Sequence, residues 1–245
     1  MRRFLLCFLA CSLGFVFAPA NAAPPCIVLD PGHNPDQGGA LGVWGIYEVV
    51  YNDALTARLA QALKAQGYKV YVTRAPTQQI GLIERARFAN DLHADLFLAI
   101  HHDSAQPKYL ERIQIAGRDA WRTTQPIAGY SIFVSLLNPQ AAKSQAFAML
   151  LGKKMSALGR PPALHHAEAI PGENREWLDA KLGIYRFDDL VVLKKTTMPA
   201  ALLEVGVIVD PTDEAYVSNK DNQTKIIEAI VKAIRGYFDG VASTR

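Results

Sequence analysis

The sequence has few cysteines, and no long apolar run follows its first residues. Of its three cysteines, Cys7 and Cys11 lie close to the N-terminus and only Cys26 lies in the body of the chain. A single cysteine has no partner for an intramolecular disulfide. Cys26 begins an apolar run, so we expect a small core residue and not a ligand. After residue 22 no apolar stretch reaches the roughly 20 residues that a membrane span needs.

The chain also lacks an excess of charge. Its 26 Lys and Arg residues and 23 Asp and Glu residues give a formal net charge of +3. Removal of residues 1–22 takes away Arg2 and Arg3 and leaves +1, and no later run of Lys and Arg exceeds two residues. A protein that binds nucleic acids presents a basic patch or stripe. We therefore predict no nucleic-acid partner.

The N-terminus has the features of an export signal. Two arginines precede the apolar run 4–18, and a small-x-small cleavage pattern follows at 20–22. Such a segment is typical of a signal peptide, here residues 1–22, with Ala23 as the mature N-terminus. This predicts a periplasmic or secreted protein without a transmembrane span in its mature chain. Two alternatives stay open, a lipoprotein cleaved before Cys11 and an uncleaved membrane anchor.

The remaining residues, 23–245, suffice for one α/β domain with its own core. Strand-like and helical patterns alternate along the first part of the chain. This alternation indicates right-handed crossovers and a largely parallel sheet. The predicted strands are 27–29, 68–73, 95–101, 129–136, 190–193 and 200–205, and the predicted helices are 51–63, 82–92, 138–158 and 226–238.

These patterns predict a three-layer α/β sandwich, with a mostly parallel central sheet of about six strands flanked by helices. Residues 105–128 have no clear period, and we expect a surface insertion there. Residues 163–187 mix Pro, Gly, Glu, Asn and Asp, and we expect irregular structure. The whole of 23–245 is interpreted as one catalytic domain.

Four polar residues fall where the carboxyl ends of the strands are predicted, which is where α/β sheets place their sites. His33 follows the first strand, and His101 ends the third. Glu204 interrupts the apolar run AALLEVGV, and Glu48 begins a helix after a glycine-rich loop. Two imidazoles and a carboxylate are typical protein ligands of a catalytic Zn²⁺, and Zn²⁺ lowers the pKa of water to about 7.

Glu204 suits a general base, because an apolar strand accepts a carboxylate only at a cost unless it is paired or functional. Each of these residues has a structural alternative. Glu204 could be a core glutamate in a salt bridge. His33 and His101, taken singly, could be hydrogen-bonded structural histidines, and their shared position at strand ends is what favours a joint site.

Four motifs stand in order along the chain and give it a family resemblance over about residues 26 to 238. They are Asp30-Pro31-Gly32-His33, then Glu48, then Ala99-Ile100-His101, then Leu203-Glu204-Val205-Gly206. They resemble those of the zinc-dependent N-acetylmuramoyl-L-alanine amidases of the type-3 family. The resemblance implies Zn²⁺ bound by His33, Glu48 and His101, and a catalytic Glu204. It also implies cleavage of the amide between N-acetylmuramic acid and the L-alanine of the stem peptide.

The chain departs from the family pattern at two places. Residues 207–210 replace an aromatic residue and a Ser-Asn pair, which bears on the wall of the pocket. After His101, His102 takes a place that is usually small, and we expect it to face the opposite side of the strand. Asp103 is expected either to orient His101 or to be a loop residue. His165 and His166, in a proline-rich stretch, are expected at the surface.

Between His101 and Glu204 the chain is longer than a minimal family member needs. We expect 105–128 and 163–187 to be substrate-groove loops. The alternative is an autoinhibitory segment that a protein activator displaces, with Glu168, Glu173 or Glu176 as the blocking ligand. The expected substrate is peptidoglycan or a muropeptide, and we expect a monomer. Two rival functions remain, another zinc peptidase or amidase of the cell wall and a non-hydrolytic wall-binding module.

Overall fold

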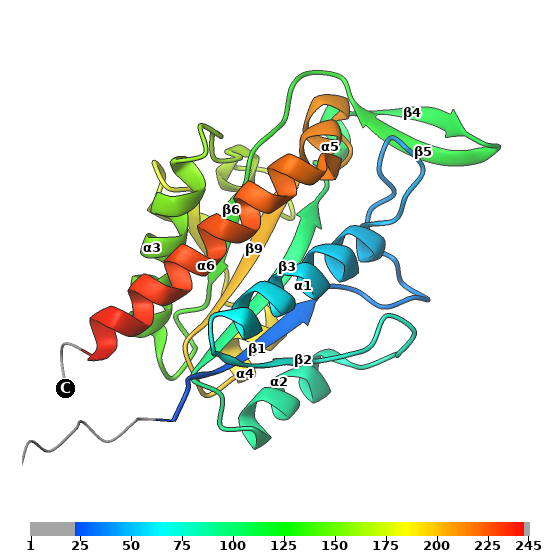
Figure 1. Cartoon of the computed structure of the whole chain (residues 1–245). Coiled ribbons are helices and arrows are strands. Elements are labelled where there is room, and N and C mark those ends of the chain that lie inside the picture. Colours follow the sequence, from blue (N-terminus) through cyan, green and yellow to red (C-terminus); the bar gives the residue numbers. More distant parts are fainter. Residues whose placement is uncertain (1–22, 243–245) are drawn as a thin grey trace, which may run out of the picture.

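The computed structural model describes residues 23–242, so the expected signal peptide lies outside the described part. A seven-stranded sheet forms the middle layer (Figure 1), in the order β2-β1-β3-β9-β6-β8-β7. Its strands are β1 (Cys26–Pro31), β2 (Lys69–Val72), β3 (Leu96–Asp103), β6 (Ser131–Val134), β7 (Glu176–Asp179), β8 (Ile184–Arg186) and β9 (Ala200–Val207).

Most neighbouring strands of this sheet run parallel. β1 pairs in parallel with β2 and β3, β3 with β9, and β6 with β8. Only β6 against β9 and β7 against β8 are antiparallel. The predicted mostly parallel sheet is confirmed. The predicted irregularity of 163–187 is wrong in part, because β7 and β8 lie there. With four and three residues, these strands are too short for a period-2 pattern to be visible in the sequence.

Helices cover both faces of the sheet, so the predicted three-layer sandwich is confirmed. Apolar residues of α1 (Glu48–Ala65), α3 (Ala141–Ser156) and α6 (Lys220–Ala242) share the larger core with one face. Those of α2 (Leu82–Asp91) and α4 (Val191–Lys195) pack on the other face. The remaining helix is α5 (Pro211–Ser218), and two 3₁₀ turns are η1 (Pro107–Tyr109) and η2 (His165–Ala167).

One predicted strand is wrong. Residues 190–193 were expected to be extended, but they enter the short helix α4, which begins at Val191. A short apolar run fits a buried helical turn as well as a strand, and only tertiary packing decides between them. The expectation for Cys26 is confirmed, since its side chain is a free, buried thiol in β1.

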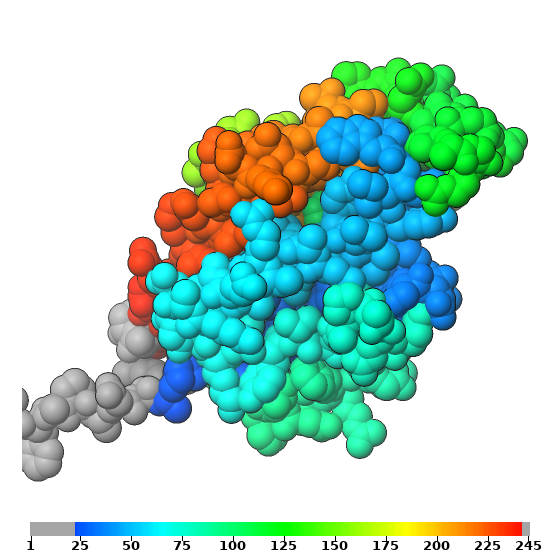
Figure 2. All heavy atoms as spheres, turned by 45° about the vertical axis from the view of Figure 1, so that its right-hand side comes forward, coloured from blue at the N-terminus to red at the C-terminus, as the bar shows by residue number. Residues whose placement is uncertain are grey.

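Residues 105–128 form a hairpin, β4 (Leu110–Ile115) and β5 (Arg118–Thr123), that projects from the carboxyl end of β3 (Figure 1). Figure 2 shows the hairpin beside the loop that precedes α1, and Arg118 donates a hydrogen bond to the carbonyl of Gly45 at 3.1 Å. The helices were also compared with the length and hydropathy of a membrane span. None of the helices in residues 23–242 is both long enough and apolar enough to cross a membrane.

The two faces of the sheet place polar side chains differently along β3. Leu98 and Ile100 point into the larger core, whereas Phe97 and Ala99 point into the core under α2 and α4. Since side chains alternate along a strand, His101 points to the side of the core under α2 and α4, and His102 points to the side of the larger core. This alternation decides which residues meet at the carboxyl end of the sheet.

A buried arginine fixes the turn that follows β1. Arg85 of α2 is 1% exposed and pairs with Asp30, with 2.9 Å between Nη1 and Oδ1. Its guanidinium also donates to the carbonyl of Pro31 at 2.7 Å and to Oδ1 of Asn34 at 2.8 Å. One side chain thus satisfies several buried acceptors in the segment that carries His33.

We predict that Arg85→Leu lowers the free energy of unfolding by roughly 3–5 kcal/mol, because Asp30 would stay buried as an unpaired charge. Urea denaturation measures this change. Arg87→Leu on the same helix is the matched control. Its pair with Asp91 is exposed, so the loss should stay below about 1 kcal/mol. Equal losses in the two variants would contradict this account of the turn.

Candidate metal centre and active site

Three adjacent strands, β1, β3 and β9, bring the predicted site residues to one edge of the sheet. His33 follows β1 by two residues, and His101 lies near the end of β3. Glu204 of β9 is the register partner of His101. Neighbours in register on parallel strands point to the same face, so His101 and Glu204 lie side by side.

Glu48, the first residue of α1, stands between the two histidines. Its Oε2 lies 2.8 Å from Nε2 of His33, and its Oε1 lies 3.1 Å from Nδ1 of His101. One donor atom from each of the three residues lies within 4.8 Å of the others. Two imidazoles and a carboxylate so arranged are suited to a Zn²⁺ ion. The residues therefore fit a metal of that kind.

The electrostatics of Glu48 agree with a ligand role. Burial by itself raises the pKa of this carboxyl group, but hydrogen bonds to His101 and His33 bring its pKa below the ordinary value. The group is therefore an anion at neutral pH despite being only 4% exposed. An ionised carboxylate is what a divalent cation requires.

Asn52 orients this carboxylate and was not identified from the sequence. It lies one turn after Glu48 on α1 and donates to Oε1 of Glu48 at 3.0 Å. Its own Oδ1 lies 2.8 Å from Nδ1 of His102, and the backbone N–H of His102 donates to Oε1 of Glu48 at 3.2 Å. The i, i+4 spacing was the signal available in the sequence.

His102 faces away from His101, as predicted. It packs beside Tyr51 and Asn52 of α1, on the face of the sheet that carries the larger core. Its side chain is 2% exposed, and burial lowers its pKa to about 3. A neutral His102 thus donates from Nδ1 to the amide oxygen of Asn52, whose NH₂ group is directed at Glu48.

The backbone at His33 is held in the left-handed region, with φ of 65°. Such a conformation is uncommon for a residue other than glycine. Arg74 donates from Nε to the carbonyl of His33 at 2.9 Å and from Nη2 to that of Gly32 at 3.1 Å. Arg85 reaches the same His33 carbonyl. Two buried guanidinium groups therefore fix the direction in which His33 presents its ring.

Glycines are required where the loop touches the site. A Cβ at Gly32 would overlap the imidazole of His101. At Gly39, where φ is +76°, a Cβ would overlap the carboxylate of Glu48 and lie 2.7 Å from Cδ2 of His33. These residues do more than lengthen the loop, because their missing side chains leave the space in which the two rings and the carboxylate meet.

Glu204 has the features of a reactive carboxyl group. It keeps some exposed surface, but its Oε2 is buried and has no hydrogen-bond partner among the described residues. Burial, and then the negative charges of Asp103 and Glu48, raise its pKa well above the ordinary value. Among residues 23–242 no Lys, Arg or His side chain forms an ion pair with Glu204. The alternative of a core glutamate in a salt bridge is therefore wrong.

Two expectations about neighbouring residues are wrong. Asp103 belongs to β3 and its Oδ2 lies 2.8 Å from Nε2 of His166 and 3.3 Å from Nε2 of His165, so it does not orient His101. The two histidines, expected at the surface, are 5% and 8% exposed. Both belong to the 3₁₀ turn η2, and His166 packs against Phe133 of β6.

The electrostatics of this second cluster differ from those of an isolated histidine. Burial lowers the pKa of His166, but Asp103 and Glu173 outweigh it and raise the pKa to about 9. For Asp103, burial raises the pKa, and the two histidines bring it below its ordinary value.

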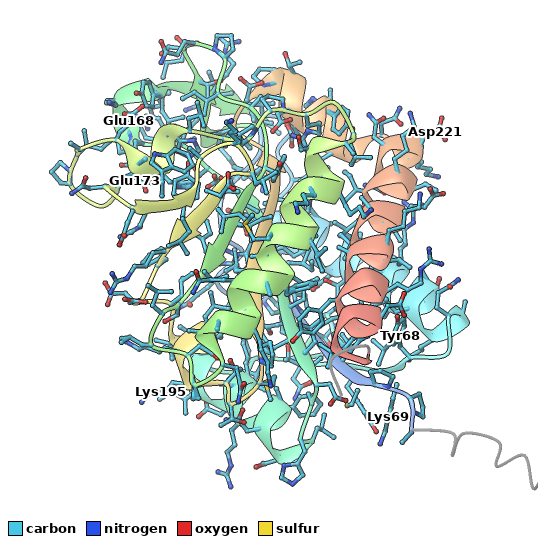
Figure 3. All side chains as sticks on the ribbon, turned by 90° about the vertical axis from the view of Figure 1, so that its left-hand side faces the viewer. Tyr68, Lys69, Glu168, Glu173, Lys195 and Asp221 are labelled. Carbon is cyan, nitrogen blue, oxygen red and sulfur yellow. The ribbon has the colours of Figure 1, made fainter. Side chains whose placement is uncertain are left out.

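The three glutamates considered as blocking ligands are engaged elsewhere. Glu168 pairs with Lys108, and Glu176 lies 3.1 Å from Arg186. Glu173 faces His166, with 3.1 Å between Oε2 and Nδ1. Figure 3 shows Glu168 and Glu173 close together in one loop region, at the end of the molecule away from Lys69 and Lys195.

Residues 207–210, where the chain departs from the family pattern, are buried. Val207, Ile208 and Val209 pack inside the protein, and the carboxylate of Asp210 caps α5 by accepting from the backbone N–H groups of Thr212 and Asp213 at 2.9 and 3.0 Å. A capping aspartate of this kind is typical at a helix start.

Comparison with known proteins agrees with this geometry. A sequence profile of N-acetylmuramoyl-L-alanine amidases matches residues 27–236. The chain belongs to this amidase family. An N-acetylmuramoyl-L-alanine amidase of Mycobacterium tuberculosis is 23% identical to it, over 90% of this chain and 89% of that protein. The resemblance drawn from the four motifs is confirmed.

Solved structures share the fold. The catalytic domain of CwlV, an N-acetylmuramoyl-L-alanine amidase from Bacillus (Paenibacillus) polymyxa, has a TM-score of 0.66 and 26% identity, covering 88% of this chain and 98% of that one. The CwlD amidase from Clostridioides difficile, solved in complex with the GerS lipoprotein, has a TM-score of 0.64 and 18% identity, covering 88% and 99%. A related fold thus occurs in an amidase that binds a protein partner.

We predict that Gly32→Ala weakens metal binding at this site, because the added methyl group displaces the imidazole of His101. Metal analysis after dialysis against Zn²⁺ measures the effect. Gly236→Ala on α6 is the matched control, since a Cβ there meets nothing within 4 Å. That variant should keep its zinc and gain roughly 0.5–1 kcal/mol of stability from helix propensity. Unchanged zinc content in Gly32→Ala would contradict the proposed crowding.

Proposed function

We propose that the protein is a Zn²⁺-dependent peptidoglycan hydrolase that acts in the periplasm or after secretion. Membership of the family makes it an N-acetylmuramoyl-L-alanine amidase, which cleaves the amide bond between N-acetylmuramic acid and the L-alanine of the stem peptide. The observation that carries the zinc proposal is the carboxylate of Glu48 between His33 and His101, with Glu204 beside them.

In this proposal His33, Glu48 and His101 hold the ion, and Glu204 does not. Zn²⁺ bound there would act as a Lewis acid that polarises the scissile carbonyl and lowers the pKa of water. The orienting residues have separate tasks. Asn52 and the backbone N–H of His102 fix one oxygen of Glu48, and Arg74 fixes the backbone that presents His33.

Glu204 supplies the proton transfers. As a carboxylate it takes a proton from the water molecule that attacks the carbonyl carbon of the lactyl group. When the C–N bond breaks, the same carboxyl group gives this proton to the nitrogen of L-alanine. The products are a lactyl carboxylate on the sugar and a peptide with a free N-terminal alanine. An unpartnered Oε2 leaves Glu204 free for both transfers.

The substrate and surroundings follow from the same proposal. Export by a signal peptide at 1–22 would bring the single catalytic domain to the cell wall as a monomer. The β4–β5 hairpin and segment 163–187 would form walls of the substrate groove. This reading is favoured over an autoinhibitory plug because Glu168, Glu173 and Glu176 pair with other residues. A protein activator is then not needed to free the site.

We expect Glu204→Gln to lose about 10²–10⁴-fold in kcat, the usual contribution of a general acid–base group, while it keeps its zinc. Release of stem peptides from purified peptidoglycan, followed by mass spectrometry, measures the loss. Glu228→Gln on the exposed side of α6 is the matched control and should be unaffected. Wild-type activity in Glu204→Gln would remove Glu204 from the mechanism. Products other than free peptides beginning with alanine would favour a different wall peptidase.

Chelation gives a second test. Dialysis against a chelator should abolish stem-peptide release, and Zn²⁺ should restore it. Mg²⁺ should not, because imidazole donors favour zinc over hard cations. A far-UV spectrum taken before and after chelation controls for unfolding. Full activity in protein shown to be free of metal would contradict the zinc proposal, and zinc content without turnover would favour a wall-binding module.

A further inference from the structure

We propose that Asp103, His165 and His166 form a second divalent-metal site, separate from the one at Glu48. Asp103 ends β3, and the two histidines lie in the 3₁₀ turn η2. One donor atom from each of the three residues lies within 4.8 Å of the other two. The site joins parts of the chain 63 residues apart, and no residue of the first site belongs to it.

His165 is the residue that points to a missing ligand. It is 5% exposed, and both of its ring nitrogens are buried without a hydrogen-bond partner among the described residues. A buried polar group without a hydrogen-bond partner destabilises the folded state. Its Nε2 nevertheless lies 3.3 Å from Oδ2 of Asp103, so the ring is directed at that carboxylate. A metal ion bound by both would give this nitrogen the partner it lacks.

His166 is oriented in the way that metal-binding histidines usually are. Its Nδ1 lies 3.1 Å from Oε2 of Glu173, and its Nε2 lies 2.8 Å from Oδ2 of Asp103. A carboxylate that accepts the Nδ1–H fixes the tautomer and leaves the Nε2 lone pair for a metal. Glu173 is itself held by Gln106, whose amide donates to its other oxygen at 2.5 Å. Figure 3 shows Glu173 in the loop that carries this arrangement.

The alternative is a metal-free network in which a protonated His166 lies between two carboxylates. That network accounts for His166, Asp103 and Glu173. In that network His165 has the 3.3 Å contact with Asp103 and stacks on His166 with centroids 4.0 Å apart, but neither of its ring nitrogens makes a hydrogen bond. A metal site accounts for all four residues, which is why we favour it.

The donors select the kind of ion. Two imidazoles and one carboxylate favour Zn²⁺ and similar transition metals over Ca²⁺ and Mg²⁺, which prefer oxygen ligands. The consequence for the fold is a link between the end of β3 and segment 163–187. Such a link would hold the 3₁₀ turn η2 at the end of β3, the strand that pairs with the Glu204 strand β9. The proposal concerns metal binding alone and does not depend on the amidase mechanism.

The test is the number of zinc ions per chain, measured by elemental analysis after equilibrium dialysis against Zn²⁺. We expect two for the wild type. His165→Asn, His166→Asn and His33→Asn should each bind one, and the double variant His33→Asn/His165→Asn none. His93→Asn is the matched control, because His93 is exposed with φ of 48°, a conformation that asparagine accepts. It should keep both ions.

Titration with Co²⁺ measures the stoichiometry by a second readout, visible absorption. We expect the visible absorption to saturate at two equivalents, and at one equivalent in His33→Asn. A wild type that binds a single ion, lost in His33→Asn, would overturn the second site. So would an unchanged count in folded His165→Asn and His166→Asn. A wild type that binds a single ion, kept in His33→Asn and lost in His165→Asn, would contradict the zinc proposal for His33, Glu48 and His101 and would support the second site.

Discussion

The site depends on one buried carboxylate with an imidazole at each oxygen. Glu48 is buried at the start of α1, which raises the pKa of its carboxyl group, yet His33 and His101 lower this pKa and keep the group ionised. One ring comes from the loop directly after β1 and the other from the neighbouring strand β3, so the carboxylate links α1 to the carboxyl end of the sheet. The loop between β1 and α1 has glycine where any side chain would occupy this space. The glycines of this loop are thus required for Glu48 to contact both imidazoles.

Side chains alternate along β3, so consecutive residues contribute to the site from opposite faces of the sheet. His101 points to the side of Glu204, whereas His102 points to α1, where it supports Asn52 and through it Glu48. Consecutive histidines therefore serve the same centre from opposite faces. Asp103, after an irregularity in the strand pairing, turns to a separate pair of histidines.

The strand ends were the predictable part of this protein. Apolar runs that stop at Asp30-Pro31-Gly32 and at His101 mark where strands deliver side chains, and the structure brings His33, Glu48, His101 and Glu204 together. The short strands β7 and β8 and the helix α4 were not predictable, because three to five residues carry no readable period. Burial of His165 and His166 was missed for a different reason. It depends on contacts with Phe133 and Asp103, which are distant in sequence.

The most direct test of the central claim is a crystal structure of the protein with Zn²⁺, with anomalous diffraction recorded at the zinc edge. The account predicts an anomalous peak about 2.0–2.2 Å from Nε2 of His33, Nδ1 of His101 and an oxygen of Glu48, with Glu204 outside the coordination sphere. The absence of a peak at Glu48, or a peak ligated by Glu204 in place of one of the histidines, would contradict it.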